Sequence, residues 1–115
     1  MPKYLTFLLL LFLLARCNDV PIIDGFQKDM WANDLKECRN YRESKGAKLL
    51  IDQKNNILGI SQNELMQLLG KPDRQQLAKR NQKFFYYQLN CQNSQELSIR
   101  FNAVGHAKEM MLITK

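Results

Sequence analysis

The chain has 115 residues, which is the length of one small domain and too short for two independent cores or a large α/β barrel. Its residues are 45% hydrophobic and 24% charged, with five Gly and three Pro, and this composition excludes a collagen-like chain and argues against wholesale disorder. The formal charge is +6, or +4 without Lys3 and Arg16, and this mildly basic balance is compatible with an anionic membrane surface or an acidic protein partner. It is poor support for nucleic-acid binding.

Residues 1–16 have the form of a signal peptide. Lys3 precedes an apolar run from Leu5 to Ala15 that only Thr6 interrupts. This run is much shorter than the roughly 20 residues that a membrane-spanning helix needs. We therefore expect export of the chain and removal of residues 1–16, with no transmembrane anchor in the mature protein.

The apolar run ends in Leu14-Ala15-Arg16-Cys17, which resembles the lipobox of bacterial lipoproteins. The resemblance implies that Cys17 is lipidated and becomes the mature first residue. Arg16 departs from the pattern, because a small residue normally precedes the cysteine, and the alternative is an ordinary secretory signal with an incidental cysteine. Residues 17–25 are then expected to be a tether, and residues 26–115 a single domain.

Two further cysteines, Cys38 and Cys91, form an even pair in a chain that we expect to be exported. Such a pair favours a disulfide, since disulfides persist in oxidising compartments. Closing a loop of about 53 residues would add about 4 kcal/mol to the stability in the chain-entropy model. The alternative is two separately buried thiols.

Two helical regions are predicted in the first half of the domain. Residues 26–45 carry apolar side chains at helical spacing, and Gly46 either ends this helix or marks a weak point before a similar spacing continues toward Ile57. Ser61 and Glu64 have the spacing of a capping box, and Gly70 with Pro72 ends the helix that follows. The second helix is the more strongly specified of the two.

After Pro72 the sequence changes to short segments rich in aromatic and branched residues, separated by turn residues. The pattern predicts strands over residues 73–77, 83–89, 96–101 and 107–114. Short connections favour antiparallel pairing between neighbours. The expected fold class is therefore α+β, with two or three amino-terminal helices packed on a three- to four-stranded antiparallel sheet.

The order of these elements, together with a set of local motifs, resembles the SmpA/OmlA family, also called BamE. The motifs lie within residues 57–105 and are Leu58-Gly59-Ile60-Ser61, Glu64-Leu65, Leu68 to Asp73, Phe85-Tyr86-Tyr87, and Leu97-x-Ile99-x-Phe101-Asn102-x-x-Gly105. The resemblance implies a lipid-anchored periplasmic domain of two helices on a three-stranded sheet, a topology shared with a β-lactamase inhibitor protein. Family members with known roles assist β-barrel assembly in the outer membrane.

The amino-terminal helix does not match that family. Trp31, Asp34 and Cys38 instead resemble the Trp-x-x-Asp-x-x-x-Cys helix of small lipoproteins of the Bacteroidetes group. The partner-binding surface of BamE therefore cannot be carried over to this part of the chain.

No catalytic or metal site is expected. His106 is the single histidine and lies in a predicted turn, whereas hydrolysis needs a nucleophile with an orienting group and zinc needs about four ligands. Asp29 and Asp34 are five residues apart, on different faces of the predicted helix, so we expect both to be solvated. No cofactor is implied.

The aromatic run Phe84 to Tyr87 is the best candidate for an interaction site. Side chains alternate between the two faces of a strand, so two of the four aromatics must leave the main core. With the cations just upstream, this composition is typical of protein interfaces. The predicted partner-binding residues are Phe85, Tyr87, Arg80 and Lys83. The alternative is that the first helix or residues 73–82 cover the second face.

The function that these observations favour is a non-enzymatic, lipid-anchored adaptor in the outer membrane or periplasm, whose sheet binds another envelope protein. A different class, a protein inhibitor of a secreted enzyme, is suggested by the other occurrence of the fold. Lipid phosphates are a further possible contact for the cations, whereas an exported protein seldom meets nucleic acid.

Overall fold

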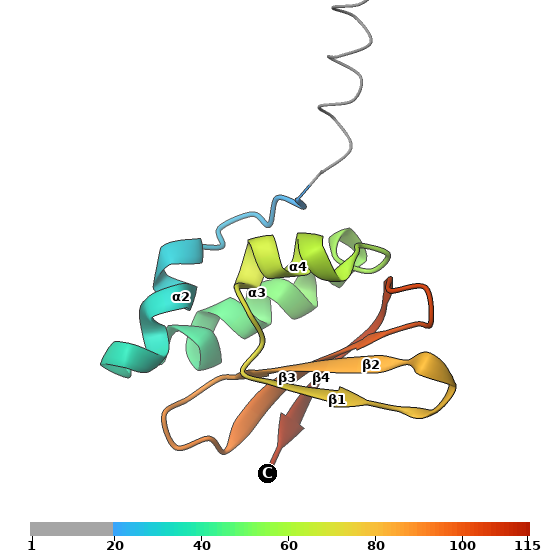
Figure 1. The fold of residues 1–115 in the computed structure, drawn as a ribbon. Coiled ribbons are helices and arrows are strands. Elements are labelled where there is room, and N and C mark those ends of the chain that lie inside the picture. The colour runs from blue at the N-terminus through green and yellow to red at the C-terminus, as the bar shows by residue number, and fades with distance from the viewer. Residues whose placement is uncertain (1–19) are drawn as a thin grey trace, which may run out of the picture.

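The structure is a computed structural model that describes residues 20–115. The predicted signal peptide, residues 1–16, and the predicted lipidation site, Cys17, lie outside the described residues. The described chain forms a layer of helices on one face of a four-stranded antiparallel sheet with strand order β1-β2-β3-β4 (Figure 1). This confirms the predicted α+β fold class. The helices are α2 (Lys28–Glu37), α3 (Ala47–Asp52) and α4 (Gln62–Leu69), and the strands are β1 (Arg74–Leu77), β2 (Lys83–Gln88), β3 (Gln95–Phe101) and β4 (Ala107–Thr114).

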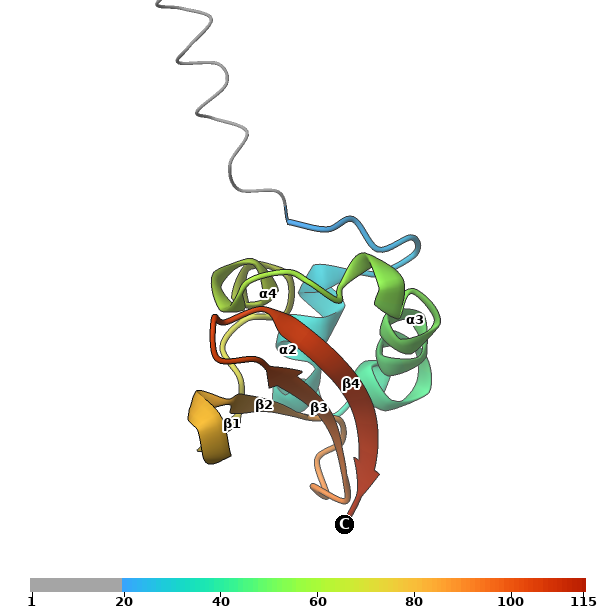
Figure 2. The ribbon, with the colours of Figure 1, turned by 90° about the vertical axis from the view of Figure 1, so that its right-hand side faces the viewer.

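The core fills the space between the two layers. Figure 2 shows the curved strands lying beneath the helices, with α3 on the side of β4. Neighbouring strands contribute aligned apolar residues, since Phe85 pairs with Ile99 and Tyr87 pairs with Leu97. The helices contribute the other large buried side chains, among them Trp31, Leu50 and Leu65. All four predicted strands are confirmed, with ends that differ by at most one residue.

The first predicted helix was wrong at its carboxyl end. Helix α2 stops at Glu37, and Cys38 follows with a left-handed φ of 52°. A new helical segment begins at Tyr41 and passes through a π-helical stretch, Arg42–Gly46, directly into α3. The buried Asp34 carboxylate explains the restart, because it accepts the backbone N–H groups of Tyr41 (2.9 Å) and Arg42 (3.2 Å) as a cap would. The expectation of a solvated Asp34 was therefore also wrong.

Gly46 lies within this second helical segment and does not end it. A Cβ atom at this position would stand 2.8 Å from Cε3 of Trp31. Glycine is therefore required here for Trp31 to pack against the helix. Of the two roles left open for Gly46 in the sequence, continuation of the helix is confirmed.

The capping box at the start of α4 is confirmed. The Ser61 hydroxyl accepts the backbone N–H of Glu64 (3.2 Å), while the Glu64 carboxylate accepts the N–H of Ser61 (3.3 Å). The helix ends at Leu69, as predicted, and is capped by Gly70, which has a φ of 80°; Pro72 follows two residues later. The carbonyl oxygen of Gly70 accepts the hydroxyl of Tyr87 (2.9 Å), so this helix end is tied to the centre of the sheet.

The predicted disulfide between Cys38 and Cys91 is present, with the two Cα atoms 5.7 Å apart. It joins the end of α2 to the loop between β2 and β3 and so connects the two layers covalently.

The predicted tether extends too far along the chain, because Ile23 is buried in the core and the compact unit begins upstream of Phe26. Over residues 20–115, no helix is both long enough and apolar enough to cross a membrane.

Candidate functional site

The four predicted partner-binding residues do not form one surface. Phe85 and Tyr87 are 1% and 0% exposed and face the helices, so their prediction as contact residues was wrong. Lys83 also points toward the helix layer, where its Nζ lies 3.4 Å from Oε1 of Gln62. Arg80 is exposed at the tip of the β1–β2 hairpin. The alternation of the aromatic run was predicted correctly, but the two sets of alternate residues were assigned to the wrong faces.

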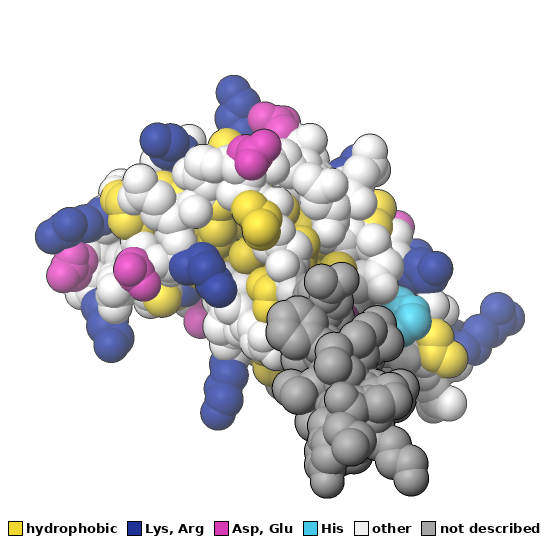
Figure 3. Space-filling model, turned by 90° about the horizontal axis from the view of Figure 1, so that it is seen from above, with side chains coloured by type: hydrophobic (Ala, Val, Ile, Leu, Met, Phe, Trp, Pro, Cys, Tyr) yellow, Lys and Arg dark blue, Asp and Glu magenta, His cyan; other side chains and the backbone are white. Residues whose placement is uncertain are grey.

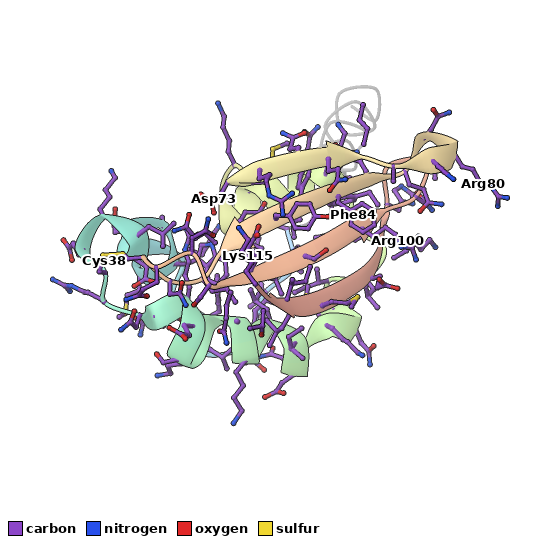
Figure 4. All side chains as sticks on the ribbon, turned by 90° about the horizontal axis from the view of Figure 1, so that it is seen from below. Cys38, Asp73, Arg80, Phe84, Arg100 and Lys115 are labelled. Carbon is purple, nitrogen blue, oxygen red and sulfur yellow. A yellow bond between two sulfur atoms is a disulfide. The ribbon has the colours of Figure 1, made fainter. Side chains whose placement is uncertain are left out.

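The opposite face of the sheet, which we call the open face, is covered by no helix or loop of the described chain (Figures 1 and 4). The strand register arranges its side chains in rows that cross the sheet. Each row runs from β1 or β2 across β3 to β4. The three rows are Gln76-Phe84-Arg100-Glu109, Arg74-Tyr86-Ser98-Met111 and Gln88-Glu96-Ile113.

An arginine and two aromatic rings form the centre of the open face. The guanidinium carbon of Arg74 stands 3.8 Å from the centroid of the Tyr86 ring, within the range of a cation–π contact. The rings of Phe84 and Tyr86 are stacked, with centroids 6.0 Å apart and an interplanar angle of 14°. The Tyr86 hydroxyl is 3.2 Å from Oε1 of Gln76. Tyr86 is thereby buried under its neighbours, whereas Arg74 and part of Phe84 stay accessible.

Glu96 forms an ion pair with the same arginine, Arg74. Its carboxylate lies 3.2 Å from Nη2 of Arg74 and 2.7 Å from Nζ of Lys115, and the glutamate itself is buried. Burial alone would raise the pKa of Glu96, but its hydrogen bonds to Lys115 and Arg74 outweigh burial, and the pKa is lowered. Glu96 is therefore ionised at neutral pH and fixes both cations.

The open face has the composition of a binding surface. The Arg74 side chain is 48% exposed although both its ring contact and its ion pair are already formed, and Met111 in the adjacent row is 49% exposed. An arginine that is held in place before binding loses little conformational entropy when a partner arrives. Arginine and aromatic side chains are also the residues that contribute most to protein interfaces.

Nothing in the described part of the chain assembles a group of three or more His, Cys, Asp or Glu residues that could hold a metal ion. His106 is exposed in the turn between β3 and β4, where its backbone N–H donates to the Asn102 side chain (2.9 Å). The open face offers hydrogen-bond acceptors and cations for binding.

A second arginine cluster lies inside the molecule and was not predicted from the sequence. Arg42 donates from Nε to the carbonyl of Trp31 (2.8 Å) and from Nη1 to the carbonyl of Gln88 (2.9 Å), and it pairs with Asp73 (3.2 Å). Burial lowers the pKa of Arg42, and the pairing with Asp73 opposes this. Asp73 in turn accepts the backbone N–H of Gln88 (2.7 Å). The cluster connects the helices to β2 and so sets the position of the strand that carries Phe84 and Tyr86.

Comparison with known proteins adds little to these observations. No protein-family model matches the chain, and no curated protein matches it. Among solved structures, the crystal structure of an osmotically inducible lipoprotein called OsmE is similar, with 22% sequence identity and a TM-score of 0.43. The match covers 50% of this chain and 68% of that one. A structural similarity this weak supports no conclusion about fold or function. The fold and the candidate site are therefore described from the residues of this chain alone.

Proposed function

We propose that this chain is a non-enzymatic, lipid-anchored protein of the bacterial cell envelope, and that it binds another envelope protein on the open face of its sheet. The observation that carries the proposal is the preorganised centre of that face. Arg74 is fixed on Tyr86 and Glu96 beside a partly exposed Phe84, in a place that no element of the described chain covers.

Two features of the chain support export and anchoring. The Cys38–Cys91 disulfide is suited to an oxidising compartment, which agrees with the signal-peptide form of residues 1–16. Cys17, at the end of that segment, provides the thiol for a lipid anchor. The role in β-barrel assembly implied by the BamE resemblance is one form that the proposed binding can take.

The binding surface is tested by photo-crosslinking in cells that express the full chain. A benzophenone amino acid replaces Met111 on the open face, and in a matched control it replaces Gln67, an exposed residue of α4. We expect a defined adduct with an envelope protein from position 111. Adding Arg74→Glu should remove this adduct, because the change reverses the charge at the centre of the face. Since it also sets a second carboxylate beside the buried Glu96, the folded fraction of the variant is measured by its denaturation curve, and the adduct is compared at equal amounts of folded protein.

Two results would contradict the binding proposal: adducts that are the same from positions 111 and 67, or an adduct from 111 that survives Arg74→Glu. The anchor is tested separately by feeding cells an acyl-chain probe. Wild type should carry the label and Cys17→Ala should not. An adduct with a secreted enzyme from protein that lacks a lipid would favour the inhibitor function instead.

A further inference from the structure

The segment that precedes the first helix is fastened to the helix side of the molecule, far from the open face. Ile23 is buried in the core. The backbone of the next residue, Asp24, forms two hydrogen bonds with the side chain of Gln53. Its N–H donates to Oε1 (2.8 Å), and its carbonyl oxygen accepts from Nε2 (2.9 Å). Val20 packs against the edge of the core. In Figure 1 this segment enters above the helices, and the open face lies below them.

A lipid on Cys17 would therefore act through a very short tether. Cys17 stands three residues before Val20 in the sequence. An extended chain spans at most about 3.5 Å per residue, so the anchored residue lies within about 10 Å of Val20. A single layer of helices is already about 10–12 Å thick. The open face thus cannot reach the membrane that holds the acyl chains, whereas the outer surface of the helices must lie close to it.

The outer surface of the helix layer carries apolar groups at the point where the tether enters. Ile22 is 85% exposed, next to the buried Ile23. It lines a shallow groove of about 260 Å³ together with Val20, Pro21, Ile23, Phe26, Lys28 and Leu68. Figure 3 shows this side of the molecule, with apolar side chains in its middle and both Lys or Arg and Asp or Glu around its rim. An apolar centre with a polar rim suits contact with the headgroup region of a bilayer.

We propose that the outer surface of the helix layer around Ile22 rests on the bilayer that holds the lipid, so that the open face points away from the membrane toward its protein partner. The inference rests on the anchor at Cys17 in the proposed function, and it adds the orientation of the domain and a second, non-covalent lipid contact. Since the rim carries charges of both signs, we expect this contact to depend on Ile22 far more than on salt concentration.

The orientation is tested with protein purified from membranes of cells that express the full chain. Cys17 is acylated and the other two cysteines are bonded to each other, so a single introduced thiol can be labelled with a fluorophore. Lys28→Cys places the label beside the groove, and Met111→Cys places it on the open face. The labelled proteins are reconstituted in vesicles of phosphatidylethanolamine and phosphatidylglycerol that contain a lipid with a quencher in its headgroup region.

We expect quenching several-fold stronger at position 28 than at position 111. Adding Ile22→Asp should weaken the quenching at position 28, and the matched change Leu77→Asp, at another exposed apolar residue, should not. Equal quenching at the two positions, or quenching at 28 that Ile22→Asp leaves unchanged, would overturn the inference. Absence of acyl label on Cys17 would instead overturn the proposed anchor. In that case Cys17 is coupled to a maleimide lipid, the fluorophore is attached by azide–alkyne chemistry to an azide-bearing amino acid in place of Lys28 or Met111, and the same comparison of positions 28 and 111 decides the orientation.

Discussion

Arg42 and Arg74 are held in similar ways on opposite sides of the sheet. Arg42 stands over the Trp31 ring at 4.7 Å and pairs with Asp73, while Arg74 stands over Tyr86 at 3.8 Å. Asp73 and Arg74 are neighbours in the sequence. Asp73 pairs with Arg42 on the inner side of the sheet, whereas Arg74 contacts Tyr86 and Glu96 on the open face. The side chain of Arg42 is 7% exposed and that of Arg74 is 48% exposed. The same chemistry therefore stabilises the fold on the inside and remains available to a partner on the outside.

Strand β2 repeats this contrast with aromatic residues. Phe85 and Tyr87 face the helices and are buried, whereas Phe84 and Tyr86 face the open side. Substitutions on the inner side should therefore lower the free energy of unfolding, and substitutions on the outer side should chiefly affect binding. Matched changes of the same residue type on the two sides can establish whether this division holds.

The largest expected difference lies between Phe85→Ala and Phe84→Ala. Phe85 is fully enclosed, and its ring contacts Phe101 edge to face with centroids 4.7 Å apart. Its removal leaves a cavity and should cost about 4 kcal/mol. Phe84 is only partly buried, and its removal should cost about 1 kcal/mol. Urea denaturation of both variants measures the two losses, and equal losses would refute the division of the sheet into a structural and a binding face.

The second comparison is between Arg42→Met and Arg74→Met. Without Arg42, the buried carbonyls of Trp31 and Gln88 lose their donor, and we expect a loss of about 3 kcal/mol. Without Arg74, Glu96 keeps its pairing with Lys115, and the loss should be about 1 kcal/mol or less. Chemical denaturation again gives both values. Similar losses would mean that Arg74 is a structural residue and would weaken the proposed function.

The strands and α4 could be predicted from sequence because their signals are local. Alternating apolar residues mark β3, and the Ser61–Glu64 pair with Gly70 marks both ends of α4. The break after Glu37 could not be predicted in this way, because the Asp34 carboxylate that restarts the helix is brought to Tyr41 by the fold of the chain. Helical spacing alone continues through the break.

The faces of β2 could not be assigned for a related reason. All four residues of its aromatic run are apolar enough for the core, so hydrophobicity does not distinguish the two sets. Only the pairing of Tyr87 with Leu97 in β3 places that set inside. The buried role of Arg42 was hidden in the same way, since its partners at Asp73 and Gln88 come from distant parts of the chain. The charged residues of the candidate site thus became apparent only from the packing of the two layers.

A third test concerns how the free energy of unfolding depends on pH through the pairing of Glu96 with Arg74 and Lys115. The pKa of Glu96 is lowered in the folded protein, because its bonds to Lys115 and Arg74 outweigh its burial. A carboxyl group with a lowered folded-state pKa stabilises the fold above its unfolded pKa of about 4.3, and that stability is lost as the pH falls through the folded-state value. Glu96→Gln should therefore be less stable than wild type at neutral pH and should lose less stability on acidification.

Measurement of the free energy of unfolding at several pH values tests this prediction. Glu109→Gln provides a control, since Glu109 also lies on the open face and forms only a long pairing with Arg100, at 3.8 Å. This variant gives the reference for removing one carboxylate from the open face. If Glu96→Gln followed the same pH profile as Glu109→Gln, the Glu96 carboxylate would not hold Arg74 as strongly as the geometry indicates.

The smallest expected effect has the opposite sign. Arg80 and Asn81 both have left-handed backbone angles, with φ of 62° and 60°, at the tip of the hairpin that leads into β2. Asparagine tolerates this conformation better than arginine, so Arg80→Asn should stabilise the protein by about 0.5 kcal/mol. Lys79→Asn removes the same charge at a neighbouring exposed position that lacks a positive φ and should bring no such gain. Denaturation curves of the two variants separate backbone strain from charge. A gain confined to position 80 would show that the left-handed backbone at the hairpin tip disfavours arginine, whereas equal changes at positions 79 and 80 would mean that the loss of a positive charge is responsible.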